Sequence, residues 1–195
     1  METATAWNDQ FDCISMVRRL AIHQPAMLSK KTVGKVVPFV AEHAKSLRSV
    51  LSRNAILCLD DLLFTCGPKL KTSGIAPAMD VLLECSAGNM PKVIRAATST
   101  ALQQATLTGP LVEVVQEAAL KVSHKNKDVQ EAAMAAVERG LKQMKVADFT
   151  DLDLKSLLPL LYDGCNCKSI AGKKSAKAAC FTLVKSLGQE SYEAE

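Results

Sequence analysis

The sequence predicts an all-helical protein, and three observations support this fold class. Apolar residues recur at spacings of three and four along most of the chain, which is the periodicity of a helix with one buried face. Alternation of apolar and polar residues, typical of a half-buried strand, is almost absent, and aromatic residues make up only 4%. Short segments rich in Gly, Pro, Ser, Asn and Lys separate the periodic stretches, as expected for tight turns between helices.

Local signals support the order of these helices. Ser29 can cap the second helix, Gly67 and Pro68 stop the third, Pro110 suits the first turn of the sixth, and Asp151 can cap the eighth. We therefore expect nine helices, over residues 8–23, 31–45, 47–66, 74–87, 90–107, 110–123, 127–144, 152–163 and 169–187.

The second helix of each successive pair repeats a pattern, in which a small residue is followed by another small or apolar residue four positions later. The aligned positions are Cys13 and Val17, Ala55 and Leu59, Ala97 and Ala101, Ala133 and Val137, and Ala176 and Cys180. The offsets between them are 42, 42, 36 and 43 residues, and helix pairs that repeat at about 40 residues are typical of HEAT and armadillo arrays. The pattern predicts an α-α superhelix of this type.

This superhelix should contain about four and a half helix pairs. The residues before the first predicted helix are too few to form a helix of equal length, so the first pair is incomplete. With 195 residues, 48% of them hydrophobic, the chain can bury a core of its own. We expect a single domain over residues 1–188 and a polar C-terminal tail over 189–195.

Composition and motifs argue against several classes of function. The formal net charge of +4 is mild, no run of apolar residues is long enough for a membrane span, and the first ten residues do not resemble a signal peptide. The seven cysteines lie mostly in apolar runs, which favours a reducing, cytoplasmic compartment. Cys165 and Cys167 form the one close pair, but no histidine lies near them, so we expect no metal site.

The sequence also lacks the motifs of common enzymes. It has no G-x-S-x-G, no G-x-x-x-x-G-K-[ST] and no H-E-x-x-H, and the Gly-Lys-Lys-Ser at 172–175 lacks the earlier glycine and the preceding strand of a phosphate loop. We expect neither catalysis nor a cofactor.

The turns within helix pairs should lie at one edge of the stack, and each turn after the first carries cations. These are Arg48, Lys92, Lys125 with Lys127, and the pair Lys173 and Lys174. Trp7, the only tryptophan, is expected in the first turn. It has two interpretations that the sequence leaves open: a lid over the end of the apolar core, or an anchor for a partner protein.

Three segments carry a family resemblance. In the first segment, Trp7 is followed by Phe-Asp-Cys-Ile at 11–14 and Val-Arg-Arg-Leu at 17–20. The second segment is 45–55, followed by Leu-Asp-Asp-Leu at 59–62. The third segment is Pro-Lys-Val-Ile-Arg-Ala-Ala at 91–97. Together they resemble the TOG domains of the CLASP type, and most closely those of the TOG array regulators of axonemal microtubules, the crescerins. The resemblance spans nearly the whole chain, with its specific motifs in the first half.

This resemblance implies a flat paddle of HEAT repeats that binds tubulin or microtubules through its turns. It implies a place on the cytoskeleton in the cytoplasm, with the cilium, axoneme or basal body as the location of the most similar proteins. A larger scaffold protein is a further partner to expect. The tubulin-binding residues that it implies are Trp7, Arg48, Ser49, Lys92, Lys125, Lys127, Lys173 and Lys174.

Two further arginines are expected to have a structural role. Arg53 and Arg95 occupy equivalent positions one turn into their helices, where they should pair with neighbouring carboxylates or carbonyls. The alternative function is a HEAT-repeat scaffold that binds another protein by its groove or concave face. Nucleic acid is not expected as a partner because the basic turns lack aromatic residues on which bases could stack, and neither is a membrane.

Overall fold

The computed structural model describes residues 4–70 and 72–193, and within these ranges every regular element is helical. The predicted all-α class is therefore confirmed for this part of the chain. The elements are α1 (Ala4–His23), η1 (Pro25–Met27), α2 (Lys30–Ala44), α3 (Ser49–Cys66), η2 (Gly67–Lys69), α4 (Thr72–Glu84), α5 (Lys92–Thr108), α6 (Leu111–Ala119), α7 (Lys127–Gln143), η3 (Val146–Asp151), α8 (Leu154–Asn166) and α9 (Ile170–Glu193), where η marks a short 3-10 helix.

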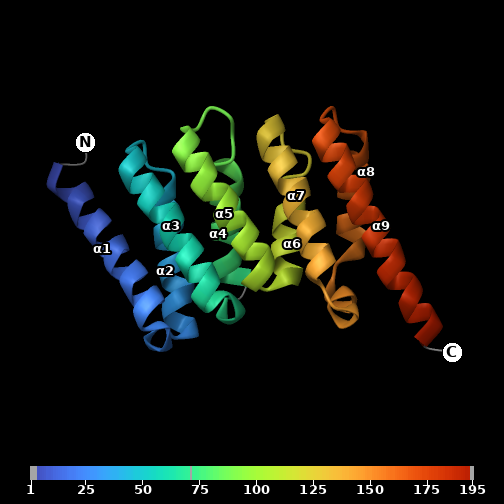
Figure 1. Ribbon diagram of the computed structural model, residues 1–195, viewed down its shortest axis with the longest axis horizontal. Helices are drawn as coiled ribbons and strands as arrows, with labels where there is room; N and C mark the ends of the chain where they lie inside the picture. Colours follow the sequence, from blue (N-terminus) through green and yellow to red (C-terminus); the bar gives the residue numbers. More distant parts are fainter. Residues whose placement is uncertain (1–3, 71, 194–195) are drawn as a thin grey trace.

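The α-helices stack side by side in two layers (Figure 1). One layer contains α1, α3, α5, α7 and α9, and the other contains α2, α4, α6 and α8. Each even-numbered helix packs against the odd-numbered helix that follows it, whereas α1 has no such partner among the described residues. Four helix pairs and one single helix result, which is consistent with an α-α superhelix.

One continuous core runs between the two layers. Ala55, Ala101, Ala133 and Ala176, four of the aligned residues, are completely buried where neighbouring helices approach closely. The first helix departs from the predicted alignment, because Cys13 is exposed and Ile14 is the buried residue. The α1 residue that faces the core therefore lies one position later than the repeat alignment predicts.

Most of the predicted helix ends lie within two residues of those in the structure. The Ser29 hydroxyl accepts a hydrogen bond from the Thr32 amide at 3.1 Å, and α3 ends at Cys66, before Gly67 and Pro68. The expected cap of α8 was wrong: residues 146–151 form η3, so Asp153 and not Asp151 caps α8.

Other helix ends differ from prediction: α1 begins at Ala4 and not at 8, and α6 ends at Ala119 and not at 123. Pro110 is the N-cap of α6, which begins one residue later, at Leu111. The backbone of α9 continues to Glu193, beyond the expected end at 187, so most of the expected tail is helical. Residues 194–195 lie outside the described part of the chain. No described helix combines the length and the apolar character that a membrane span requires.

Asp60 on α3 is a carboxylate whose position lowers stability. Its Oδ1 atom is buried and has no hydrogen-bond partner within the described part of the chain. Burial raises the pKa of Asp60 above its ordinary value, and the charge of the adjacent Asp61 raises it further. Because the folded-state pKa is raised, ionisation of Asp60 lowers the free energy of unfolding. This loss begins as the pH rises through the unfolded-state pKa, is complete above the folded-state pKa and persists at all higher pH values.

We therefore expect Asp60→Asn to raise the free energy of unfolding at pH 7 by less than about 1 kcal/mol, because the side chain is partly solvated. The gain should shrink at pH 3, where aspartate is protonated in both states. Urea unfolding at the two pH values measures this difference, and an equal gain at both would contradict it. The adjacent control, Asp61→Asn, should have the opposite sign at pH 7, because Asp61 accepts a hydrogen bond from Arg18 at 2.7 Å.

Candidate functional site: the edge of the turns within pairs

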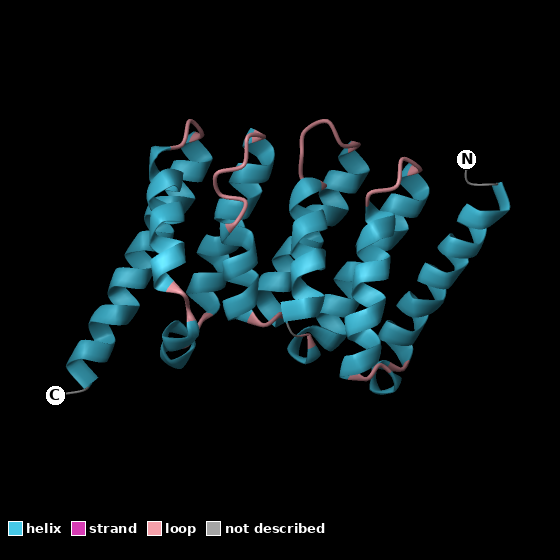
Figure 2. Cartoon of the chain, turned by 180° about the vertical axis from the view of Figure 1, so that it is seen from behind, coloured by secondary structure: helices cyan, strands magenta, loops and turns pink. Residues whose placement is uncertain are grey.

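The four turns that join the helices of a pair lie at the same edge of the stack, seen from both sides in Figures 1 and 2. We call this edge, comprising residues 45–48, 85–91, 120–126 and 167–169 with the first turn of each following helix, the turn edge. The other edge carries the connections between pairs, including the three 3-10 helices.

All six predicted cations and Ser49 belong to the turn edge. Arg48 is the N-cap of α3, Ser49 begins α3, Lys92 begins α5, Lys127 begins α7, Lys125 lies in the preceding turn, and Lys173 and Lys174 lie near the start of α9. Each of these side chains is exposed to solvent. Residues that are far apart in sequence are thus arranged along one edge, as the repeat pattern predicts.

Trp7 lies in a helix and not in a turn, which corrects the sequence expectation. Helix α1 begins at Ala4, so Trp7 sits about one turn into it, half-buried and packed against the core. The guanidinium carbon of Arg48 lies 5.1 Å from the centre of its indole ring. This cation–π contact contributes roughly 0.5–1 kcal/mol at an exposed site, and it joins α1 to the first turn of the edge.

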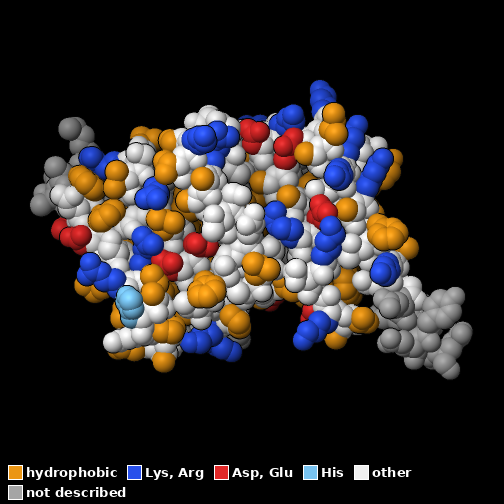
Figure 3. Space-filling view, in the orientation of Figure 1, with side chains coloured by type: hydrophobic (Ala, Val, Ile, Leu, Met, Phe, Trp, Pro, Cys, Tyr) orange, Lys and Arg blue, Asp and Glu red, His pale blue; other side chains and the backbone are white. Residues whose placement is uncertain are grey.

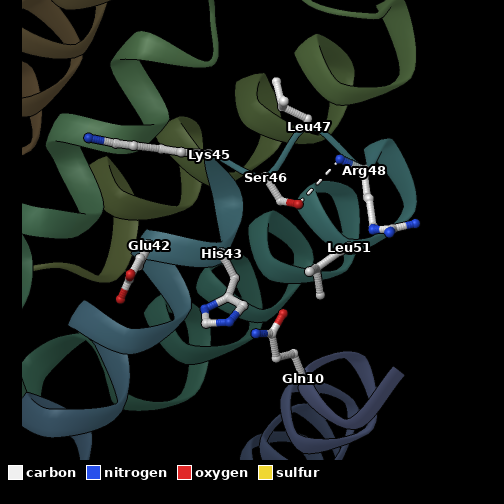
Figure 4. Close-up of a pocket in the computed structure, with 8 residues that line it drawn as sticks. All are labelled: Gln10, Glu42, His43, Lys45, Ser46, Leu47, Arg48 and Leu51. Carbon is white, nitrogen blue, oxygen red and sulfur yellow. Dashed lines mark hydrogen bonds between the residues drawn. The ribbon is translucent and has the colours of Figure 1, made fainter. Parts of the chain in front are cut away.

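A groove of about 750 Å³ opens beside this contact (Figure 4). The α2–α3 turn forms one wall, in which the Arg48 amide donates a hydrogen bond to the Ser46 hydroxyl at 3.2 Å. His43 forms part of the lining, and its ring packs against Phe39 with 4.5 Å between ring centres. This groove was not predicted from the sequence. Its lining residues are Gln10, Glu42, His43, Lys45, Ser46, Leu47, Arg48 and Leu51.

Exposed apolar side chains accompany the cations at every turn, a feature that sequence reasoning missed. Leu47 is fully exposed in the first turn, and Ile170 is 86% exposed in the fourth. Val93 and Leu120 are exposed at the second and third turns. Their only sequence signal is an apolar residue next to a helix boundary, which does not distinguish an exposed side chain from a buried one. The turn edge is therefore both basic and apolar.

Other lysines near the edge are paired with carboxylates. Lys121 contacts Asp80 and Glu84, both at 2.7 Å, and Lys45 contacts Asp80 at 3.1 Å. Burial favours a higher pKa for Asp80, but hydrogen bonds from Lys121 and Lys45 outweigh it and lower the pKa. Hydrogen bonds to Asp80 and Glu84 raise the pKa of Lys121. This cluster links three successive helix pairs.

The pairing leaves a smaller set of available cations. Lys127 shares its charge with Glu131, 3.6 Å away on the same helix. Lys92, Lys125, Lys173 and Lys174 form no ion pair with any described residue. These four lysines are the charges that a partner could neutralise along the edge.

Arg53 and Arg95 are exposed and form no ion pair within the described residues. Their stabilising role stays a prediction. The arginine that does join two helices is Arg18 on α1, which donates to Asp61 and Asn54 on α3.

Arg95 also contributes to a second hollow, of about 360 Å³, on the layer of odd-numbered helices. Asp128, Glu131 and Arg139 lie in the same lining. The Arg139 Nε is buried without a hydrogen-bond partner among the described residues, and burial lowers the pKa of this guanidinium.

The structure separates the close cysteine pair of the sequence. The Cys167 thiol is buried and points to the carbonyl oxygen of Ser169 at 3.5 Å, whereas Cys165 lies against Cys180 on α9. Within the described residues, no group of three or more His, Cys, Asp or Glu side chains is arranged to hold a metal ion.

Comparison of the sequence with models of known protein families gives no match, and a search of curated proteins gives no significant match either.

Proposed function

We propose that this chain is a non-catalytic domain that binds tubulin or microtubules, a TOG-like paddle of HEAT repeats that uses the turn edge. Its site on tubulin is an acidic protein surface, and its place in the cell is the cytoskeleton. The observation that carries the proposal is the alignment of unpaired lysines from three different turns along one edge. Trp7 and Arg48 complete this edge at its first turn.

The positions of the cations support a role in binding. The N-terminus of a helix carries a partial positive charge, so a cation there is electrostatically unfavourable. Yet Lys92 begins α5 and forms no ion pair with any described residue, whereas Lys127, which begins α7, is offset by Glu131 on the same helix. Stabilisation of α5 does not account for the charge of Lys92, whereas attraction of an acidic partner does.

The exposed apolar side chains add the second component that an interface needs. Long-range attraction between a basic edge and an acidic surface accelerates encounter and fixes orientation, while buried apolar contacts supply most of the affinity. Leu47, Val93 and Ile170 lie beside the cations and would be covered by a partner seated there.

The test is the double substitution Lys92→Glu with Lys125→Glu, measured by co-sedimentation with microtubules and by gel filtration with soluble tubulin. We expect affinity to fall at least about tenfold, because two attractive contacts become repulsive. Helicity should be unchanged, since both side chains are exposed and a carboxylate at the start of α5 favours the helix.

The matched control is Lys30→Glu with Lys35→Glu on α2, which changes the net charge equally, away from the turn edge. It should retain binding. Binding that survives the reversal at Lys92 and Lys125, or that falls equally in the control, would count against the turn edge.

A second candidate function is a HEAT-repeat scaffold that binds another protein through its grooved face. The hollow beside Arg95 and Arg139 favours this alternative, because two guanidinium groups there could receive a carboxylate. Arg95→Glu with Arg139→Glu separates the two candidates: this change should abolish binding to a scaffold partner and leave tubulin binding intact.

A further inference from the structure

The positive charge of this protein is concentrated at its C-terminal end. Residues 164–189 contain five lysines and no acidic residue. Because the whole chain has a formal charge of +4, the remainder carries −1. Lys168, Lys173, Lys174, Lys177 and Lys185 are all exposed, and none forms an ion pair within the described part of the chain. Figure 3 shows this gathering of basic side chains over α9.

One face of α9 points away from the rest of the protein. Ala176, Ala179 and Leu183 are buried against α7 and α8. On the opposite side of the helix, exposed residues follow at helical spacing: Ile170, Lys174, Lys177, Phe181 and Val184. Phe181 is 71% exposed and Val184 is 73% exposed.

Helix α8 extends this surface. It meets α6 through the side that carries Ser156, Leu157 and Leu160. Leu158 and Tyr162 lie on the other side of the helix, exposed, where no described helix follows. A stack of helix pairs normally ends in a polar outer surface, because the terminal pair has no neighbour to cover its apolar face. Here the outer side of the last described pair carries exposed apolar side chains and lysines together.

We propose that this outer face of α8 and α9 docks an acidic amphipathic helix of a partner protein. The apolar row formed by Leu158, Tyr162, Phe181 and Val184 would receive the apolar side of that helix, and the lysines would pair with its carboxylates. The docked helix would occupy the position that a further helix of the stack would take. Lys177, Phe181, Val184 and Lys185 lie further along α9, apart from the turn edge, whereas Lys168, Lys173 and Lys174 belong to both surfaces.

Charge complementarity selects the partner. Five unpaired lysines in a segment without acidic residues, 164–189, attract carboxylates, and this attraction sets orientation and encounter rate. Leu158 and Val184 add aliphatic surface beside the exposed rings of Tyr162 and Phe181, which suits the apolar anchors of a helix. Base stacking on these two rings is the alternative that a comparison with single-stranded DNA tests. Helices that bind in this way present apolar anchors at i, i+3, i+4 and i+7.

The experiment uses three synthetic helical peptides and fluorescence anisotropy. The first has leucines at i, i+3, i+4 and i+7 with glutamates around them; the second has glutamine for every glutamate; the third has serine for every leucine. We expect the full chain to bind the first peptide at least about tenfold more tightly than either of the others, because the surface offers both charge and apolar area.

Two variants locate the site. Phe181→Ser with Val184→Ser, and Lys177→Glu with Lys185→Glu, should each weaken binding of the first peptide at least about tenfold. All four side chains are exposed, so circular dichroism should show unchanged helicity. The control Lys30→Glu with Lys35→Glu, of equal charge change, should bind normally, as should the variant reversed at Lys92 and Lys125.

Equal weakening by the control would overturn the proposal, because net charge alone would then explain binding. Tighter binding of single-stranded DNA than of the acidic peptide, at the same salt concentration, would also overturn it. A third contrary result would be a chain that binds no peptide but self-associates, with the self-association abolished by the changes at Phe181 and Val184. The variant reversed at Lys177 and Lys185 should bind tubulin as the unaltered protein does. Failure of the peptide-docking proposal can therefore be distinguished from failure of the tubulin-binding proposal.

Discussion

Replacement of Gly67 by alanine is expected to lower the free energy of unfolding by about 3 kcal/mol, near the upper end of the range for overpacked sites. Gly67 is the C-cap of α3, is buried, and has ordinary right-handed helical backbone angles, so alanine suits its conformation. The cost comes from contact alone. A Cβ atom at this position would overlap the carbonyl oxygen of Thr108 at the end of α5. That neighbour is backbone, and it cannot move aside as the end of a flexible side chain could.

The same region is fixed by a second contact, which prevents easy relaxation. The Thr108 hydroxyl donates a hydrogen bond to the Leu63 carbonyl at 2.6 Å, so the ends of α3 and α5 are already joined. For a protein of this size a loss of 3 kcal/mol corresponds to a decrease in Tm of roughly 6–12 °C. Thermal unfolding followed by circular dichroism measures it.

Gly34→Ala on α2 is the matched control. No heavy atom outside the local chain lies within 4 Å of a Cβ built there, so the new methyl group meets open space. Both substitutions reduce the freedom of the unfolded chain equally. Because alanine favours a helix interior over glycine by about 1 kcal/mol, Gly34→Ala should raise stability. A Tm that rises for Gly67→Ala as well would show that α3 and α5 can separate without cost.

Local pattern was enough to predict the helices of this protein. Periodicity and turn residues predicted nine helices, and the structure has an α-helix at each predicted position within the described residues. The misplaced cap at Asp151 shows the limit, because residues 146–151 form a 3-10 helix whose polar residues resemble a turn. The inward position Ile14 was also missed, since α1 packs on α3 without a paired helix and the repeat alignment assumes one.

The candidate site was predictable in its position but not in its chemistry. The repeat period placed Arg48, Lys92 and Lys125 at one edge, because side chains at equivalent repeat positions share an edge of a stack. Whether a lysine is available to a partner depends on carboxylates of another helix pair. Asp80, for example, forms ion pairs with both Lys45 and Lys121. Such contacts join residues that no local pattern relates, so they required the structure.

The polar junction between α1 and α3 was missed for the same reason, and it carries the other large expected effect. Asn54 is 6% exposed, and its amide donates to the Phe11 carbonyl at 3.2 Å and to the Ser15 hydroxyl at 3.0 Å. Its side-chain oxygen accepts from Arg18 at 3.1 Å, while Arg18 also donates to Asp61 at 2.7 Å. Asn54→Ala should therefore lower the free energy of unfolding by about 2–3 kcal/mol, because a buried side chain loses three hydrogen bonds worth about 1 kcal/mol each.

This loss should act first on α1, which packs on α3 without a helix partner of its own. Trp7, the only tryptophan, lies on α1 and reports its detachment through fluorescence. In Asn54→Ala we expect the red shift of Trp7 emission to precede the loss of helical circular dichroism during urea unfolding, whereas the two transitions should lie closer together in the unaltered protein. Arg19→Met, at an exposed neighbouring position on α1, should change stability by less than about 0.5 kcal/mol. Coincident transitions in Asn54→Ala, with a midpoint like that of Arg19→Met, would mean that apolar packing alone holds α1 in place.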